Sequence, residues 1–303
     1  MTYKHLFTPS KALPENKVSP YIYSEPIILA VNIALATERP LLIRGAPGSG
    51  KSSLAKNIAF QLDWAYYEEV ISSRTQAQDL LWRFDSLRRL HDAQAQLLHD
   101  PVIPYINPGV LWWAYDSESA VRRGAPENVS VEAAECPGQI SKNSDHSVVL
   151  LDEIDKADPD LPNNLLVPLG ASQFRVTESG FLVEVKNPPL ILITTNEERD
   201  LPKAFLRRCV ILTIERPDNN QLLKIAKAHY GSSGSDIKLY EAIIEIMDKI
   251  IDKKGNINGL LSTAEYLDTI RTCRELGVKP GEAILNDIAL MTLSKPMYQL
   301  DKG

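Results

Sequence analysis

The sequence predicts an α/β protein in which a parallel sheet is followed by a small helical domain. Between residues 41 and 214, short apolar runs typical of buried strands alternate with segments whose apolar residues recur at helical spacing. Strands that alternate with helices are joined by crossovers, which make neighbouring strands parallel. After Pro217 no strand pattern occurs, and we place a domain boundary near Arg216. Four helical patterns then follow, near residues 219–230, 236–253, 262–276 and 281–293.

The N-terminal part of the chain precedes the first strand. Residues 1–20 contain prolines and serines near lysines, which favours an arm or loop. From Tyr21 to Thr37 the pattern is helical, and Pro40 ends that helix. We therefore expect an arm over residues 1–20, an α/β domain over 21–216 and a helical domain over 217–303.

Five apolar segments have the length and composition of buried strands. They are residues 41–43, 66–72, 147–151, 190–194 and 210–214. Between the second and the third, residues 75–98 predict one or two helices. Residues 101–146 predict an insertion, with Trp112 and Trp113 in its structured part and a polar loop around residues 123–146.

Two elements are predicted between the third and fourth strands. A helical pattern covers about residues 159–169. Alternating apolar residues then flank Glu178-Ser179-Gly180, which predicts a β-hairpin at about residues 174–185.

A phosphate-binding pattern follows the first strand directly. Residues 45–53 read GAPGSGKSS and contain G-x-x-x-x-G-K-S between a strand and a helix, the context that this motif requires. Glycines let the backbone turn sharply and point its N–H groups at a polyphosphate, and the helix adds the positive end of its dipole. A plain glycine turn is the competing interpretation.

We expect this loop to bind a nucleoside triphosphate. Lys51 supplies a charge for the outer phosphates, and the Ser52 hydroxyl is a ligand for Mg²⁺. The residues expected to contact the nucleotide are Gly45, Ala46, Pro47, Gly48, Ser49, Gly50, Lys51, Ser52 and Ser53.

Two acids follow the third strand, so they emerge at the carboxyl edge of the sheet, where ligands bind in open α/β folds. Asp152 fits a ligand of Mg²⁺, and Glu153 fits the group that orients or deprotonates a water molecule. The alternative is that these two acids only cap the next helix. The phosphate loop earlier in the chain favours a functional role for them. We assign Asp155 and Lys156 to capping and surface roles.

Three further residues have two interpretations each. Asn196 ends the fourth strand. In a sheet whose fourth strand lies beside the first, the Asn196 amide faces the γ-phosphate and helps to hold the water. The alternative is an asparagine that only forms a turn. Arg207 and Arg208 precede the fifth strand. They are either a solvated pair or arginines supplied to a neighbouring subunit. Spacing alone leaves both alternatives open.

Composition limits the setting of this chain. The 303 residues are 44% hydrophobic and 24% charged, an ordinary soluble balance, and the net charge of −6 argues against general nucleic-acid binding. No apolar run is long enough to cross a bilayer, so we expect no membrane insertion. Cys136, Cys209 and Cys273 lack metal or redox spacing, which favours a cytoplasmic location.

Together, GAPGSGKS, LLDEIDKAD, ITTNEERDLPKAFLRRC and the trailing helices resemble the AAA+ ATPases over about residues 21–280. The resemblance is nearest to the MoxR branch and its CoxD-like subgroup, to which ISSRTQAQDLLWRFDSLRRLHDAQ and LDEIDKADPDLPNNLL are similar. It implies a P-loop NTPase sheet of strand order 5-1-4-3-2 with Asn196 as first sensor, followed by a helical lid. It also implies that Arg208 is the arginine finger, with Arg207 as runner-up.

The resemblance carries further expectations about assembly. Residues 101–115 resemble an insertion that this family has in its second helix. Residues 174–185 resemble the hairpin before its sensor strand. In the rings of such relatives, both elements usually face the pore or the client protein. Relatives form hexameric rings, act as chaperone-like remodellers and work with von Willebrand A domain partners. Where many of them have a basic second sensor, this chain has Ala264, and Arg271 lies two helical turns further on.

The function expected from these features is an ATP-hydrolysing ring motor that remodels or assembles a partner protein. One alternative is an ATP-controlled assembly switch or scaffold with little turnover. Another is a DNA-remodelling or antiviral-defence ATPase, which the acidic balance of the chain disfavours.

Overall fold

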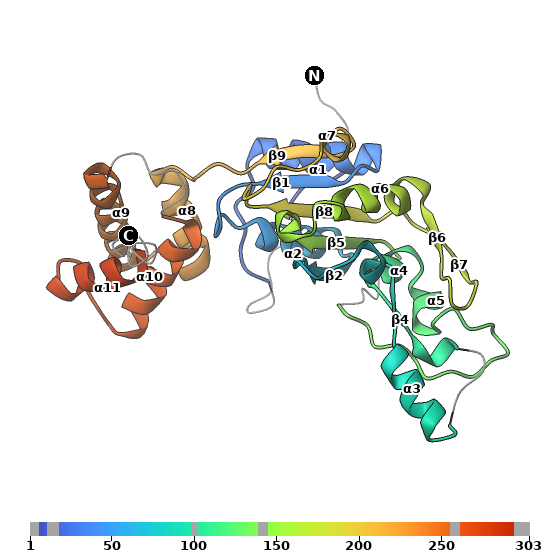
Figure 1. Cartoon of the computed structure of the whole chain (residues 1–303). Helices are drawn as coiled ribbons and strands as arrows, with labels where there is room; N and C mark the ends of the chain where they lie inside the picture. The colour runs from blue at the N-terminus through green and yellow to red at the C-terminus, as the bar shows by residue number, and fades with distance from the viewer. Residues whose placement is uncertain (1–5, 11–17, 98–101, 139–144, 255–260, 294–303) are drawn as a thin grey trace. The chain divides into compact units, whose positions relative to one another are not determined.

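The computed structural model of the chain describes residues 6–10, 18–97, 102–138, 145–254 and 261–293 (Figure 1). These residues form two compact units. The first, here called the sheet unit, holds residues 25–44 and 58–212 with the N-terminal residues up to 11. The second, here called the lid unit, holds residues 45–57, residues 213 onward and the segment that ends at Ser24.

The sheet has five strands in the order β2-β5-β8-β1-β9. Numbered along the chain as first to fifth, this is the predicted order 5-1-4-3-2, which is confirmed. The strands are β1 (Leu41–Arg44), β2 (Ala65–Val70), β5 (Ser147–Asp152), β8 (Leu190–Thr195) and β9 (Val210–Thr213). Each lies within two residues of its predicted start.

The register brings the carboxyl ends of four strands to one edge of the sheet. Arg44 pairs with Thr195, Leu151 with Ile193, and Val70 with Asp152, all in parallel ladders. The central strands β1, β5 and β8 are buried along almost their whole length, because a parallel sheet is covered on both faces. Loops that follow β1, β5 and β8 therefore start side by side.

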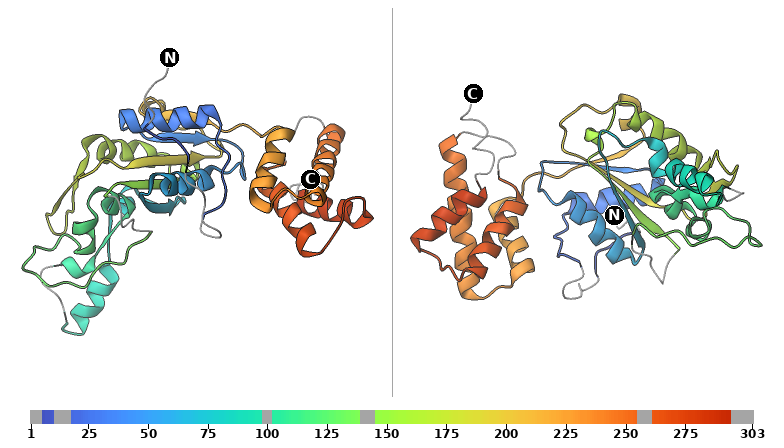
Figure 2. Two further views of the ribbon diagram at one scale, coloured as in Figure 1. Left: turned by 180° about the vertical axis from the view of Figure 1, so that it is seen from behind. Right: turned by 60° about the horizontal axis from the view of Figure 1, so that its bottom comes forward.

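Helices flank this sheet (Figure 2). Helix α1 (Glu25–Thr37) packs on β1, and α4 (Val110–Tyr115) packs on β2 and β5. The helix predicted from Tyr21 begins only at Glu25, where Pro26 fits a first turn because its missing N–H has no helical partner. The other helices beside the sheet are α2 (Lys51–Leu62), α6 (Leu161–Ala171) and α7 (Lys203–Leu206).

The described part of the N-terminal arm is docked on α1. The Oδ1 atom of Asn32 accepts hydrogen bonds from the backbone N–H groups of Leu6 and Phe7, at 2.6 and 2.9 Å. Its Nδ2 donates to the carbonyl of Phe7 at 2.9 Å, and the Phe7 side chain is buried. Residues 1–5 and 11–17 of the predicted arm lie outside the described residues.

The prediction of one or two helices over residues 75–98 was only partly correct. The segment contains a 3-10 turn (Ala77–Leu80), strand β3 (Trp82–Phe84) and helix α3 (Ser86–Gln94). Strand β3 pairs antiparallel with β4 (Ile106–Pro108). Three residues are too few to show a period of two, and the partner strand lies more than twenty residues away in the chain.

The insertion and the hairpin share an aromatic cluster, which consists of Trp82, Trp112, Phe174 and Phe181. The hairpin strands are β6 (Gln173–Arg175) and β7 (Leu182–Glu184). The rings of Trp82 and Phe174 stack at 5.7 Å, and those of Trp112 and Phe181 at 5.9 Å. A short helix, α5 (Ser117–Val121), follows α4, and residues 123–138 form no helix or strand.

The described residues of the lid unit form four helices after the sheet. They are α8 (Asn219–Tyr230), α9 (Gly234–Lys254), α10 (Thr263–Glu275) and α11 (Ala283–Leu293). Capping boxes begin two of them, at Asp218 with Gln221 and at Ser262 with Glu265. Tyr240, Tyr266 and other buried apolar side chains form its core. Among the described residues, no helix combines the length and apolar character that crossing a bilayer requires.

Candidate functional site

The glycine loop forms a tight turn between β1 and α2. Gly48 and Gly50 have φ angles of 71° and 90°, values that side chains with a Cβ rarely adopt. The backbone N–H of Ser49 donates to the carbonyl of Ala46 at 3.2 Å, and that of Leu54 to Gly50 at 2.9 Å. The turn therefore leads directly into the first turn of α2.

Lys51 lies beneath this loop. Its Nζ donates hydrogen bonds to the carbonyl oxygens of Gly45, at 2.8 Å, and Ala46, at 3.0 Å. Only 6% of the residue is exposed. A buried ammonium held by two carbonyls places a fixed positive charge at the centre of the loop, as the binding of a polyphosphate requires.

Within the lid unit, the start of α10 contacts Gly48. The N–H of Ala264 donates to the Gly48 carbonyl at 3.1 Å. A Cβ added to Gly48 would lie 2.5 Å from the Ser262 hydroxyl oxygen, so only glycine fits there. Ala264, at the position of the expected second sensor, touches the loop through its backbone. Arg271 lies about 10 Å further along the helix axis, at 1.5 Å per residue.

Tyr21 borders the same loop and was not singled out from the sequence. A Cβ on Gly50 would contact its Cε2 at 3.4 Å. The neighbouring Tyr23 donates from Oη to Asn57 Oδ1 at 2.8 Å, which ties this segment to α2. Burial raises the pKa of Tyr21 to about 12, so its phenol is neutral at physiological pH.

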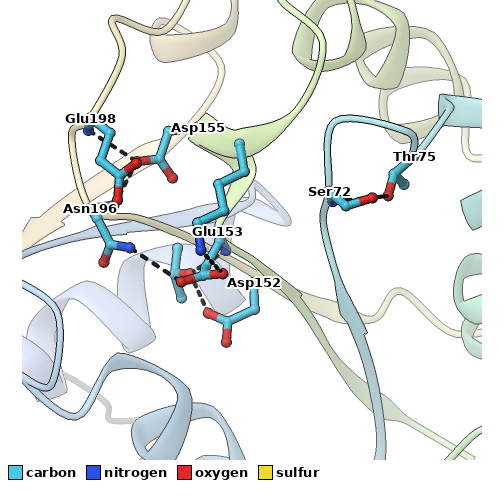
Figure 3. Close-up of polar contacts among 9 residues, drawn as sticks. Ser72, Thr75, Asp152, Glu153, Asp155, Asn196 and Glu198 are labelled. Carbon is cyan, nitrogen blue, oxygen red and sulfur yellow. Dashed lines mark hydrogen bonds and ion pairs between the residues drawn. The ribbon is translucent and has the colours of Figure 1, made fainter.

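In the sheet unit, Asp152 ends β5 and Glu153 follows it (Figure 3), and Thr194 of β8 hydrogen-bonds to both. The Thr194 hydroxyl donates to Asp152 Oδ1 and accepts the backbone N–H of Glu153 at 2.8 Å. Glu153 has a φ of 61°, a conformation uncommon for residues with a side chain. Such strain often accompanies a functional position.

Both carboxylate oxygens of Glu153 have partners. The amide nitrogen of Asn196 donates to Oε1 at 3.3 Å (Figure 3). The ammonium of Lys156 donates to Oε2 at 2.6 Å. The hydrogen bond with Glu153 raises the pKa of Lys156, and nearby negative charges add to this effect. The Glu153 side chain remains 29% exposed, so solvent reaches it.

Asp155 positions the segment that carries Asn196. Its Oδ2 accepts the backbone N–H groups of Asn196 and Glu198, each at 3.1 Å. The residue is 3% exposed, and its Oδ1 has no hydrogen-bond partner among the described residues. The capping or surface role assigned to Asp155 was therefore wrong, because it is buried and its carboxylate holds the Asn196 segment. Lys156 is exposed, as expected of a surface residue, and it also contacts Glu153.

Arg207 and Arg208 lie at the end of α7. Both are exposed, whereas Phe205 and Cys209 on either side of them are buried. The turn that carries the two arginines therefore has a buried residue on each side, while the arginines themselves are exposed.

The structure groups the predicted residues in two sets. Asp152, Glu153 and Asn196 meet at the carboxyl edge of the sheet unit, and the glycine loop, with Lys51 at its centre, belongs to the lid unit. Strand β1 ends with Arg44 at that same edge, and the glycine loop begins at the next residue. The described residues contain no cluster of three or more His, Cys, Asp or Glu that could hold a metal by themselves.

Comparison with known proteins gives one family match. The family described as AAA domain (dynein-related subfamily) matches residues 40–209, which is more than half of the chain. No curated protein matches the sequence.

Several solved structures are remotely similar. A point mutant of RuvB from Thermotoga maritima is 14% identical with a TM-score of 0.45, over 92% of this chain and 69% of that one. A putative ATPase from Cytophaga hutchinsonii is 15% identical with a TM-score of 0.41, over 86% and 78%. The RuvB Holliday junction branch migration motor of Thermotoga maritima is 15% identical with a TM-score of 0.44, over 87% and 65%.

Proposed function

The chain belongs to the AAA domain family of the dynein-related subfamily, and from this premise we propose that it binds and hydrolyses ATP to drive changes in a partner protein. One observation carries the proposal. A partly exposed carboxylate, Glu153, is held by Asn196 at the sheet edge where β1 passes into a glycine loop with a buried lysine.

The residues present suit ATP and Mg²⁺. Gly48 and Gly50 provide the open backbone, and Lys51 the charge, for a polyphosphate. Ser52 and Asp152 offer hard oxygen ligands, which Mg²⁺ prefers. When bound there, Mg²⁺ would neutralise charge on the phosphate oxygens. Backbone groups of residues 45–53 complete the proposed nucleotide contacts.

In the proposed mechanism, Glu153 orients a water molecule and accepts a proton from it as the water attacks the γ-phosphate. Asn196 holds Glu153 through its side-chain amide and is proposed to help hold the attacking water. ADP and phosphate result. Lys51, and Arg208 of the partner subunit, stabilise the negative charge of the transition state. Arg207 is the runner-up for this last role.

We further propose that the protein is a MoxR-type ring motor, of the CoxD-like subgroup, that works as a hexamer with a von Willebrand A domain protein. The support is the motif resemblance, together with the insertion and the hairpin that pack through one aromatic cluster. The proposed division into an arm (residues 1–20), an α/β domain (21–216) and a lid (217–303) follows the same resemblance. A cytoplasmic location is part of this proposal.

Steady-state hydrolysis tests the function. A motor should turn over ATP on its own and faster with a von Willebrand A domain partner. If ATP instead causes assembly with negligible turnover, the protein is an ATP-controlled scaffold. Binding to DNA that weakens steeply as salt rises would favour the DNA-remodelling or antiviral-defence alternative.

A further inference from the structure

We propose that Arg39 is a positioning residue that sets the place of the arginine finger offered to the next copy of this chain. The proposal rests on the proposed function, in which Arg208 acts on the nucleotide of a partner subunit. Its basis is one side chain that binds three consecutive backbone carbonyls around that arginine.

The contacts involve residues far apart in the chain. Arg39 Nε donates to the carbonyl of Arg208 at 3.0 Å. Its Nη2 donates to the carbonyls of Arg207, at 2.6 Å, and Cys209, at 2.9 Å. A helix leaves its last carbonyls without partners, and the turn after α7 exposes these three. The planar guanidinium, with N–H donors in a fixed arrangement, binds all three together.

Other contacts hold the same turn from both sides. Val210, which follows it, donates its N–H to the carbonyl of Pro40 at 2.8 Å, and Pro40 adjoins Arg39. Phe205 and Cys209 are buried in the core of the sheet unit. The backbone of Arg207 and Arg208 is therefore fixed at several points, whereas their side chains are exposed.

This arrangement suits a group that acts across a subunit boundary. A finger must reach the transition state accurately, because a displacement of about 1 Å can cost about 10²-fold in rate. Arg39 is itself exposed and belongs to the connection between α1 and β1. Its guanidinium orients the backbone that carries Arg208, so its effect should appear in the site of the next subunit.

Arg122 offers a matched control. It also donates to three backbone carbonyls, those of Ala125, Pro126 and Val129, in a loop outside the proposed machinery. Arg39→Ala should bind ATP as wild type does and hydrolyse it up to about 10²-fold more slowly. Arg122→Ala should keep wild-type turnover. Arg39→Lys keeps the positive charge but lacks the planar arrangement of N–H donors. Its turnover should therefore lie between those of wild type and Arg39→Ala.

Mixtures of inactive variants reveal on which side of the interface Arg39 acts. Arg39→Ala subunits keep Glu153 and present a misplaced finger, whereas Glu153→Gln subunits present a correct one. Mixing these two variants should therefore restore turnover. A mixture of Arg39→Ala with Arg208→Ala should stay inactive, because neither variant presents a correct finger.

The reference mixture is Glu153→Gln with Arg208→Ala, measured after subunit exchange. If it restores turnover and Arg39→Ala is rescued by Arg208→Ala, Arg39 serves its own subunit's nucleotide site and the inference is wrong. Wild-type turnover of Arg39→Ala, or rescue by neither variant, also overturns it. If the reference mixture itself stays inactive, the shared site fails, and this inference fails with it. Should Arg39→Ala fail to fold, Arg39→Lys replaces it in the same mixtures.

Discussion

The side-chain amide of Asn196 donates a hydrogen bond to the carboxylate of Glu153, 3.3 Å away, across 43 residues of chain. The pairing of β5 with β8 brings the two together, because each residue follows the end of its strand. A carboxylate held by an amide and still partly exposed is suited to hold a water molecule.

Glu153→Gln should leave ATP binding intact and abolish turnover. Glutamine keeps the shape and the contact with Asn196 but cannot accept a proton. Equilibrium binding and steady-state hydrolysis are the two measurements. Hydrolysis at the wild-type rate by this variant would falsify the role of Glu153.

Lys51→Ala should lose detectable ATP binding in calorimetry, because the phosphates lose the charge that is held beneath the loop. Lys56→Ala is the matched control, since Lys56 lies on the same helix and is exposed. The control should bind as wild type does. Equal affinity of wild type and Lys51→Ala would refute the assignment of the loop.

Arg208→Ala should bind ATP normally and hydrolyse it about 10³-fold or more slowly, the loss typical of an arginine finger. Arg207→Ala is the neighbouring control and should lose much less. Turnover of both variants is compared at saturating ATP. If only Arg207→Ala is inactive, the finger is Arg207; if both are active, the arginines are a solvated pair.

Lys156→Met should raise turnover by no more than about fivefold. The Lys156 ammonium donates a hydrogen bond to Glu153 Oε2 at 2.6 Å. An exposed ion pair of this kind contributes at most about 1 kcal/mol. Removing it frees that oxygen for water. A fall in turnover would show that Lys156 orients Glu153 rather than competing for it.

The same pair predicts a pH dependence. The hydrogen bond raises the pKa of Lys156, so its ammonium is fully charged below the ordinary lysine value of about 10.4, and on the alkaline side the pair is lost only above that value. The ratio of turnover between Lys156→Met and wild type should therefore stay constant from about pH 7 to 9. A ratio that falls towards one within that range would contradict this expectation.

Asp155→Ala should lower the free energy of unfolding by about 2 kcal/mol, because the N–H groups of Asn196 and Glu198 lose their acceptor. Asp155→Asn keeps an acceptor oxygen and should lose less. Chemical denaturation measures both variants. Turnover of Asp155→Ala should also fall, since the segment that carries Asn196 is released; unchanged stability and turnover would remove Asp155 from the site.

Several features followed from the sequence because they depend on neighbouring residues. The glycine loop is recognisable from eight consecutive positions, and an apolar strand before Asp152 places that acid at an edge of the sheet. The strand order required the family resemblance, since strand composition does not specify which strands are neighbours.

Tertiary structure decided which residues support the site. Thr194 joins Asp152 to Glu153, and Arg39 binds the turn at Arg208, through contacts that span 41 to 169 residues. No local pattern marks a threonine or an arginine for such a contact, because its existence depends on strand register and on the distance between carbonyl and guanidinium. The sequence thus determined the chemical groups at the sheet edge. Packing determined their partners, since a hydrogen bond forms only where donor and acceptor meet within about 3 Å.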